Sequence, residues 1–502
     1  MTHGVATTGG RRGLVILVVM VVVTLSALIG SSVLLLGEDA NASTTFDRRA
    51  TQARLSAWSG VQAVMARLHD QREDLLLGAT PDLPESWTFP IETDGAPPAF
   101  RLIGGDGEVY ATSENAKLDV NLATAEMLAA LPMIDERLAQ AIVAARPFGS
   151  IPELGMVEGV TPELLYGGQL EPGEAIGGAD ATDPGGVLEG NLTLADVLTV
   201  FSFDPNIQIG VGEKGEAHAG NRRINLGLGW SDQLERGVRE RWDESAAAFL
   251  QSLFEQGAEI KKTSDVVALY RRFGLSPSDW AEGLDALTVI ESEHVRGLVD
   301  LNHASAVVLS AVPGIDEDAA RAIVDARERL SLDQRTSIVW PLVEGVLDED
   351  AFQEASDWLT TRSTQWRVRV EGGTLEPGQA PGADPLGEAA PLLDRVVLEC
   401  VLDVSSRRPR VAYLRDVTGL DLALAMRRGT EFEETSAALA LPEDLVEPAP
   451  EDADLFDLSM PTLPEALGET PEPSHDAGES DPDAARPGGR IGRWTTGEEG
   501  TP

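Results

Sequence analysis

The sequence predicts an α+β fold: a long N-terminal helix, a small antiparallel sheet, and a large, mostly helical domain inserted between the strands of that sheet. Three observations predict this fold. An uncharged apolar run at 14–36 continues without proline into a helical pattern that ends near residue 77. Alternating strand patterns occur near residue 100 and return only after residue 365. Between them, segments rich in Ala, Leu, Glu and Arg favour helices.

Composition limits the classes of function. The chain has 502 residues, enough for two to four domains, and carries 83 acidic against 39 basic residues, a net charge of −44. Proteins that bind nucleic acid draw affinity from Lys and Arg, so this balance argues against such a role and favours cations or basic protein surfaces as partners. Cys400 is the only cysteine, which excludes an intramolecular disulfide and a cysteine-based zinc site.

The apolar run at 14–36 is predicted to span a membrane. As a helix its 23 residues measure about 34 Å, enough for a hydrocarbon core of about 30 Å. Arg11 and Arg12 precede it and acidic residues follow it, which places the N-terminus in the cytoplasm and most of the chain on the other side. The alternative is a cleaved secretory signal, but the run lacks a small-residue cleavage site at its end.

The segments after the span have different patterns. Apolar residues at helical spacing between Trp58 and Leu68 predict one packed face, and Pro81 and Pro84 stop the helix. Around Gly104–Gly107, two short alternating runs flank a turn, which predicts a hairpin. The predicted segments are a leader at 1–13, the span at 14–36, its helical continuation at 37–78, first strands at 98–116, a helical insert at 117–365 with a Gly-rich linker at 173–190, closing strands at 366–416, and a disordered acidic tail at 441–502.

The insert contains a duplication. Residues 117–146 align without gaps with residues 298–327, and the two units extend over 117–165 and 298–352. In each copy Thr124 or Ser305 is placed to cap a first helix, a short turn follows, and an aspartate is placed to cap a second helix. The turn residues are Pro132 and Asp135 in the first copy and Pro313, Gly314 and Asp316 in the second.

These units resemble the helix-hairpin-helix motif, in which turn N–H groups hold a nucleic-acid phosphate beside a helix N-terminus. The first turn lacks glycine, and Asp135 and Asp316 stand where a second glycine is expected. A carboxylate there repels phosphate, so the units are predicted to be helical packing modules.

No pattern predicts catalysis, and we expect the chain not to be an enzyme. The six histidines form no metal motif, and no nucleophile elbow or P-loop occurs. Gly210–Gly215 matches G-x-G-x-x-G, but no helical periodicity follows it, so a plain loop is expected. The acidic loop Asp180–Asp183 offers oxygen donors for calcium without EF-hand spacing.

The order of parts resembles the K-type minor pseudopilin family of the type II secretion system. The resemblance rests on Arg-Arg-Gly13 before the apolar helix, its continuation to Leu77, and a hairpin that leads into the acidic and Lys-containing run at 113–125. It covers about residues 11–416 without the glycine-rich linkers and the tail. Ala116 stands where the family has a glycine before the lysine.

The resemblance implies that a prepilin peptidase cuts after Gly13 and that Leu14 becomes a methylated N-terminus. It also implies that the apolar helix leaves the inner membrane to pack in the pseudopilus and that the insert caps the tip. Val18 stands where most pilins have a glutamate and K-type members lack it. Family members bind calcium in the helical domain, but no loop here matches closely enough to assign ligands.

We therefore expect a non-enzymatic subunit of the bacterial inner membrane, with its bulk in the periplasm, that helps to initiate or cap a pseudopilus. Its expected partners are the other minor pseudopilins and the prepilin peptidase. One alternative is a membrane-anchored helix-hairpin-helix protein that binds DNA during uptake. A further alternative is a membrane-anchored interaction scaffold of another kind.

Overall fold

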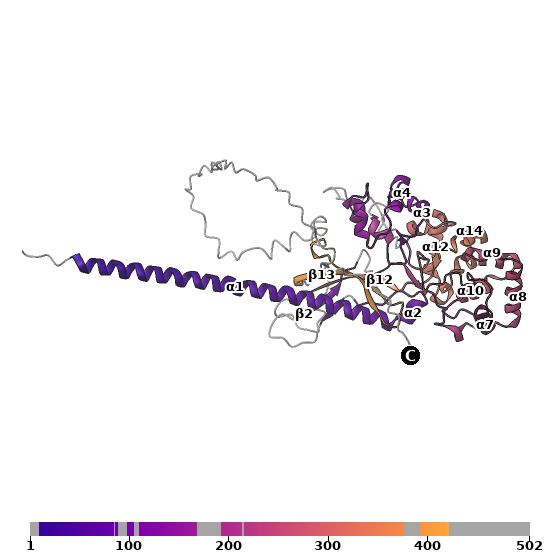
Figure 1. Ribbon diagram of the computed structural model, residues 1–502, viewed down its shortest axis with the longest axis horizontal. Helices are drawn as coiled ribbons and strands as arrows, with labels where there is room; N and C mark the ends of the chain where they lie inside the picture. The colour runs from indigo at the N-terminus through magenta and orange to yellow at the C-terminus, as the bar shows by residue number, and fades with distance from the viewer. Residues whose placement is uncertain are drawn as a thin grey trace, which may run out of the picture. The chain divides into compact units, whose positions relative to one another are not determined.

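The computed structural model describes residues 10–84, 86–88, 98–104, 110–167, 192–212, 215–375 and 392–420. They lie in the compact unit Met1–Ser436, and Figure 1 shows its long helix, its sheet and its helical domain. The α+β class and the insertion of the helical domain between strands are confirmed. The predicted linker at 173–190 and the tail at 441–502 lie outside the described residues.

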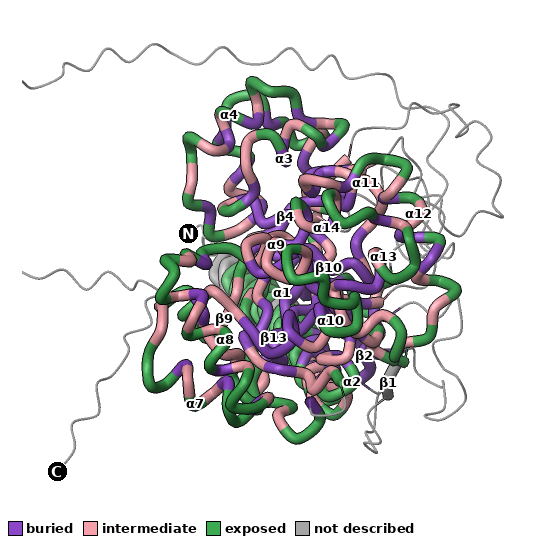
Figure 2. The backbone as a smooth tube through the Cα atoms, turned by 90° about the vertical axis from the view of Figure 1, so that its right-hand side faces the viewer, coloured by how far each residue is buried: buried purple, intermediate pink, exposed green. Residues whose placement is uncertain are grey.

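Helix α1 (Gly10–Asp70) runs through the predicted span and its continuation, and the short helix α2 (Arg72–Leu76) follows. Within α1, Leu17–Leu34 is long and apolar enough to cross a membrane, and none of these residues is buried. Further along, α1 contacts the sheet and becomes buried on one face. Figure 2 looks nearly along the helix and shows exposed turns of α1 in green. One helix therefore has an apolar part that the described residues leave unburied and a later part that belongs to the core.

The buried face of α1 differs in part from the predicted face. Val61, Val64 and Leu68 are buried as predicted, but Trp58 is 39% exposed. The reason is the closeness of helix and sheet: a Cβ placed on Gly60 would lie 2.6 Å from Phe100. Small residues hold this crossing, so the large indole lies to one side of it.

The main sheet is antiparallel, with strand order β1-β2-β12-β13-β14. Strands β12 (Gln365–Thr374), β13 (Leu393–Asp403) and β14 (Arg410–Asp416) are the predicted closing strands. They bury Trp366, Val368 and Cys400 against α1. Burial raises the pKa of the Cys400 thiol to about 12, so this cysteine stays protonated in the core.

The predicted hairpin near Gly104–Gly107 is wrong. Strands β2 (Pro98–Leu102) and β3 (Ala111–Ser113) do not pair with each other, because both pair with successive parts of β12. Strand β12 is ten residues long, so both short strands can pair with the same edge of it, one after the other. The outer neighbour of β2 is β1 (Ser86–Thr88), which the sequence did not predict.

The helical domain contains three modules, although the sequence predicted only a duplication. Each module begins and ends with a two-residue strand, and the two strands pair in parallel. The pairs are β4 (Leu118–Asp119) with β5 (Leu198–Thr199), β7 (Ile224–Asn225) with β8 (Leu287–Thr288), and β10 (Val299–Asp300) with β11 (Leu359–Thr360). All three closing strands have the sequence Leu-Thr, and Asn225 stands where the other modules have aspartate.

Helices fill each module, and most of their buried apolar residues belong to one cluster. In the first module they are α3 (Ala125–Ala129), α4 (Glu136–Ala144), α5 (Pro162–Tyr166) and α6 (Leu194–Val197). In the middle module they are α7 (Asp232–Arg241), α8 (Glu244–Glu255), α9 (Thr263–Phe273) and α10 (Pro277–Ala286). In the last they are α11 (Ala306–Leu309), α12 (Glu317–Arg329), α13 (Trp340–Val343) and α14 (Glu349–Ala355). The 3₁₀ turns are Ile151–Met156, Glu216–His218 and Leu332–Arg335, and β6 (Phe203–Pro205) pairs with β9 (His294–Arg296) between modules.

Candidate functional site

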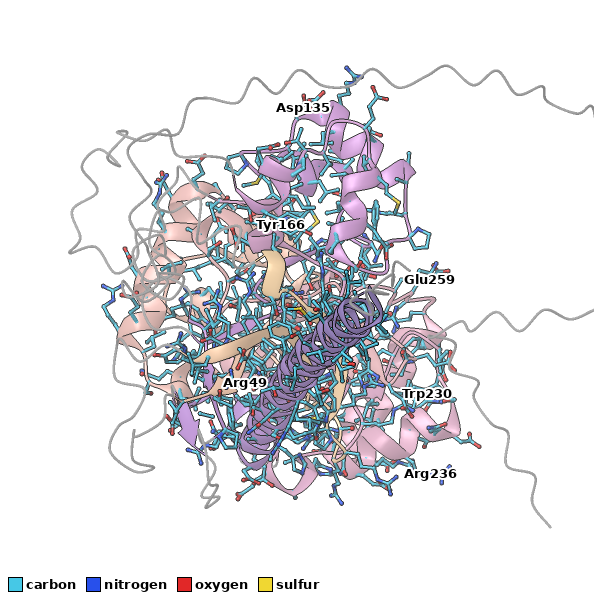
Figure 3. All side chains as sticks on the ribbon, turned by 90° about the vertical axis from the view of Figure 1, so that its left-hand side faces the viewer. Arg49, Asp135, Tyr166, Trp230, Arg236 and Glu259 are labelled. Atoms are coloured by element: carbon cyan, nitrogen blue, oxygen red, sulfur yellow. The ribbon has the colours of Figure 1, made fainter. Side chains whose placement is uncertain are left out.

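The two predicted turns adopt the helix-turn-helix geometry that the sequence indicated. Asp135 accepts a hydrogen bond from the backbone N–H of Leu138 at 2.7 Å and caps α4. Asp316 accepts from Ala319 at 2.8 Å and caps α12. Figure 3 shows Asp135 at the periphery of the side chains drawn, where solvent reaches it.

The backbones of the two turns differ at one residue. Gly314 has a φ of 82°, whereas Met133 occupies the matching place with an ordinary negative φ. The N–H of Ile134 and that of Ile315 still close the turns, at 3.0 and 3.1 Å. The first turn therefore forms without glycine.

The caps limit what these turns can bind. At the starts of α4 and α12, the side chains of Asp135 and Asp316 each accept a hydrogen bond from a backbone N–H group. In each helix this N–H is one of those that would otherwise be free to bind a phosphate. Further acids follow at once: Glu136 after Asp135, and Glu317 and Asp318 after Asp316. Both turns therefore present negative charge where a nucleic-acid backbone would approach.

A model of the helix-hairpin-helix motif matches residues 113–167, which covers the first module up to the end of α5. No curated protein matches the sequence significantly. The match, together with the apolar helix α1, supports a helix-hairpin-helix unit in a chain with a candidate membrane span. That is compatible with a secretion role and with a DNA-binding role.

Gly13 and Leu14, the predicted processing residues, lie inside α1, but their side chains are outside the described residues. Val18 lies in the apolar part of the helix and is 52% exposed. Cleavage after Gly13 stays a prediction.

A buried charge network joins the first module to the sheet, and the sequence analysis missed it. Arg367 of β12 donates from Nε to Glu114 at 2.6 Å and from Nη1 to Glu399 at 2.8 Å, while Arg369 reaches the other oxygen of Glu399 at 3.0 Å. Burial raises the pKa of Glu114, but the Arg367 guanidinium, the Lys117 ammonium and a hydrogen bond from Thr199 together outweigh burial and hold that pKa below its usual value. Burial lowers the pKa of the nearby Lys117 ammonium, whose Nζ donates to the Ala195 carbonyl at 2.7 Å.

A second polar link joins the last module to the end of α2. The His303 ring lies with Nδ1 2.7 Å from Asp300 and Nε2 3.1 Å from the Thr80 hydroxyl. This order of groups resembles a nucleophile, base and orienting acid. However, Asp300 also accepts from the Asn302 N–H and from Ser363, and neither Thr80 nor His303 lines the cavity described below. We interpret the link as a structural connection.

The other sequence motifs have simple outcomes. The N–H groups of Ile209, Gly210 and Val211 donate to the Asp285 carboxylate at 2.8–3.1 Å, so the start of the glycine motif binds the protein's own acid. Among the described residues, no group of three or more His, Cys, Asp or Glu side chains is arranged to hold a metal ion. The acidic loop Asp180–Asp183 lies outside the described residues.

Proposed function

We propose that this protein is a minor pseudopilin-like subunit that helps to initiate or cap the pseudopilus of a type II secretion system. The observation that carries the proposal is the division of α1. One part is apolar and unburied among the described residues, and the other packs on an antiparallel sheet that also carries a large helical insert. A helix of this kind suits a subunit that is first held in a membrane and then packs against neighbouring subunits.

In this proposal the inner membrane holds Leu14–Leu36 until a prepilin peptidase cuts after Gly13. The neighbours of the freed helix are the other minor pseudopilins. The glutamate that many pilins carry near the mature N-terminus is absent, since Val18 takes its place. An apolar residue there demands no charged partner inside the membrane. The proposal assigns the chain no catalysis and no required cofactor, and leaves calcium as a ligand suggested by the family resemblance.

The test is mass spectrometry of the mature N-terminus after expression in a host with a prepilin peptidase. We expect a chain that begins at Leu14. Gly13→Leu should remain uncut, because the bulky side chain occupies the cleavage position, whereas Gly4→Leu changes another leader glycine and should be cut normally. An intact Met1 on the wild-type chain would contradict the pseudopilin proposal.

The second candidate is a membrane-anchored DNA-binding protein of DNA uptake, and the motif match at 113–167 favours it. The acidic caps weigh against it. Full-length protein in detergent should show no retardation of duplex DNA at physiological salt. Salt-sensitive binding by the wild type, lost when Arg137 of the first unit is changed to Glu, would instead favour this candidate.

A further inference from the structure

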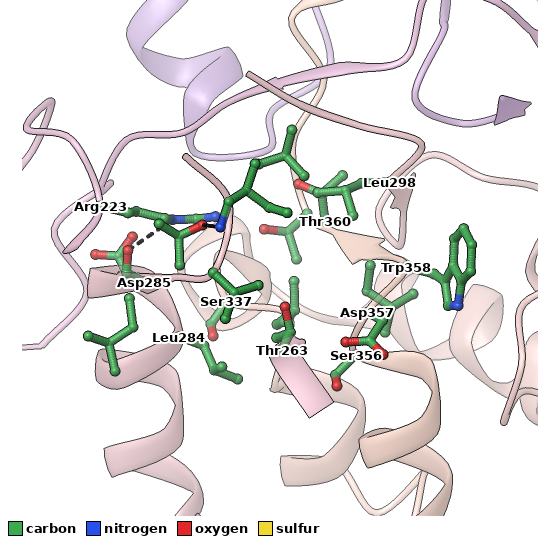
Figure 4. A pocket seen from close by; sticks show the side chains of 18 of the residues that line it. Arg223, Thr263, Leu284, Asp285, Leu298, Ser337, Ser356, Asp357, Trp358 and Thr360 are labelled. Carbon is green, nitrogen blue, oxygen red and sulfur yellow. Dashed lines mark hydrogen bonds between the residues drawn. The ribbon is translucent and has the colours of Figure 1, made fainter. Parts of the chain in front are cut away.

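A cavity of about 330 Å³ lies between the middle and the last module of the helical domain, and its lining includes no residue of the helix-hairpin-helix turns. Its walls come from five separate parts of the chain: the loop before β7, the start of α9, the segment from α10 to β10, the segment just before α13, and the segment around β11. Figure 4 shows Arg223 and Asp285 on one side of it and Trp358 on the other. Pockets that bind small molecules have this size and this position between structural units.

The charge of the cavity is opposite to that of the protein. Acidic residues outnumber basic ones by 83 to 39 in the chain, yet the lining has five basic residues and two acidic ones. The basic residues are Arg223, Lys261, Lys262, Arg296 and Arg362, and the acidic ones are Asp285 and Asp357.

Both acidic side chains of the lining are already used by the fold. Asp285 accepts from three backbone N–H groups, as described above. Asp357 accepts from the N–H and the hydroxyl of Ser264 at 2.9 and 2.8 Å, at the start of α9. Neither carboxylate forms an ion pair with a guanidinium of the cavity among the described residues.

Two arginines retain donors that the described residues do not satisfy. Arg223 donates from Nε to the Asp285 carbonyl at 3.0 Å, and its two Nη atoms have no partner among the described residues. Arg362 is 2% exposed, and its Nη1 is buried without a hydrogen-bond partner there, although Asp204 pairs with its other nitrogens. Burial and the neighbouring Arg362 lower the pKa of Arg223. An anion in the cavity would relieve this repulsion.

The remaining wall is apolar and suits a ligand with a hydrocarbon body. Leu284, Leu287, Leu298, Leu359 and Ile338 line it together with Trp358. We propose that this cavity binds a small organic carboxylate, with the carboxylate at Arg223 and Arg362 and the apolar body against the leucine wall. Arginine recognises carboxylates through paired N–H donors, and the wall disfavours a fully hydrated inorganic anion.

The test is equilibrium dialysis of the full chain in detergent with labelled benzoate, and with a detergent blank. We expect saturable binding of a single benzoate per chain and binding of benzamide, the neutral analogue of the same shape, that is weaker by about tenfold or more. This comparison needs no variant. Absence of saturable benzoate binding, or equal binding of benzamide, would overturn the proposal.

A matched pair of variants locates the site. Arg223→Gln should weaken benzoate binding by about tenfold or more. Arg222→Gln should leave it unchanged, because Arg222 is exposed, donates to the Glu291 carbonyl and does not line the cavity. Equal binding by both variants would contradict the assignment. Inorganic phosphate that displaces benzoate at lower concentration than unlabelled benzoate would reassign the site to inorganic anions and overturn the organic class.

Discussion

Asp204 and Arg362 form a fully buried ion pair across 158 residues of sequence, with Nη2 of the arginine 2.8 Å from the carboxylate. Asp204 follows the closing strand of the first module, and Arg362 follows that of the last. The arginine also donates to the carbonyls of Pro205 and Ile207 at 2.8 and 3.0 Å. Burial raises the pKa of Asp204, but Arg362, together with the charge of Arg223 and a hydrogen bond from Thr360, outweighs burial and holds this pKa below its usual value. The pair therefore joins the ends of two modules.

Removing one member of this pair should destabilise the fold strongly. Asp204→Ala leaves a buried guanidinium without its counter-ion, and we expect a loss of about 3–5 kcal/mol in the free energy of unfolding. The double variant Asp204→Ala/Arg362→Met should lose less than the sum of the two single changes. Urea unfolding of the full chain in detergent, followed by tryptophan fluorescence, measures both.

An exposed pair is the control for that experiment. Asp318 lies 2.8 Å from Arg321, but its side chain is 93% exposed. Asp318→Ala should leave the urea midpoint unchanged, because solvent screens the pair. A loss as large as that of Asp204→Ala would contradict the importance of burial.

Asp119 and Asn225 hold the same place in two modules, and this equivalence predicts a stabilising change. Each side-chain oxygen accepts from the N–H two residues later at 2.8 Å. Burial raises the pKa of Asp119 from 3.8 to about 6. The folded state therefore binds a proton that the unfolded state has released between these pH values, so this residue's contribution to stability falls as pH rises from 3.8 to about 6.

Asp119→Asn keeps the acceptor and removes the charge. We expect it to raise stability at pH 7 by about 1–3 kcal/mol and to remove this part of the pH dependence. Thermal unfolding of both proteins at a series of pH values from 3.8 to 7 measures the effect. Asp300→Asn, the same change in the last module, should destabilise because it places an amide against His303 and Ser363. If both variants changed the stability in the same direction, the difference that we assign to Asp119 and Asp300 would be wrong.

Substitutions at three glycines distinguish the cost of backbone strain from the cost of a steric clash. Gly314 has a φ of 82°, and a Cβ there would lie 2.4 Å from the Ala351 carbonyl oxygen. Gly345 has a φ of 71° and open space, and Gly155 has open space without a positive φ. We expect Gly155→Ala to be neutral, Gly345→Ala to cost about 1 kcal/mol, and Gly314→Ala to cost more than either. Urea midpoints rank the three, and another order would contradict this explanation.

The modules show what the sequence could predict. The first and last copies were visible because Thr124, Asp135, Ser305 and Asp316 occupy capping positions in matching order, and local caps depend on local sequence. The middle module was missed. Its strands have two residues each, its Asn225 replaces aspartate, and its equivalence appears only when Leu287 and Thr288 pair with β7. Pairing across more than 60 residues is a tertiary property.

The long-range sites were invisible for the same reason. Trp366–Val370 was predicted as a strand from its alternation, but nothing in that pattern indicates that β2 and β3 share its edge. The cavity combines Arg223 with Arg362, and Arg367 meets Glu114 only after the insert folds back on the sheet. The sequence around each arginine did not indicate that its side chain would be buried, because isolated arginines normally lie in solvent.

The crossing of α1 over the sheet predicts the last variant. A Cβ placed on Gly372 of β12 would lie 2.1 Å from the backbone nitrogen of Ala57, so no side chain fits there without separating helix and sheet. Gly372→Ala should lower the free energy of unfolding by about 1–3 kcal/mol. It should also expose the second half of α1 to trypsin near Arg67. Gly419→Ala, where open space surrounds the added carbon, should change neither.

Separation of α1 from the sheet is also the step that connects this contact to the proposed function. The Leu17–Leu34 part of α1 is not buried in the described structure, whereas the second half packs in the core, so the second half is the part that can transmit the position of the helix to the sheet and the insert. We therefore expect Gly372→Ala to be processed at Gly13 like the wild type yet to support less secretion. Normal secretion by a variant whose helix is freely cut by trypsin would show that this packing is not required for assembly.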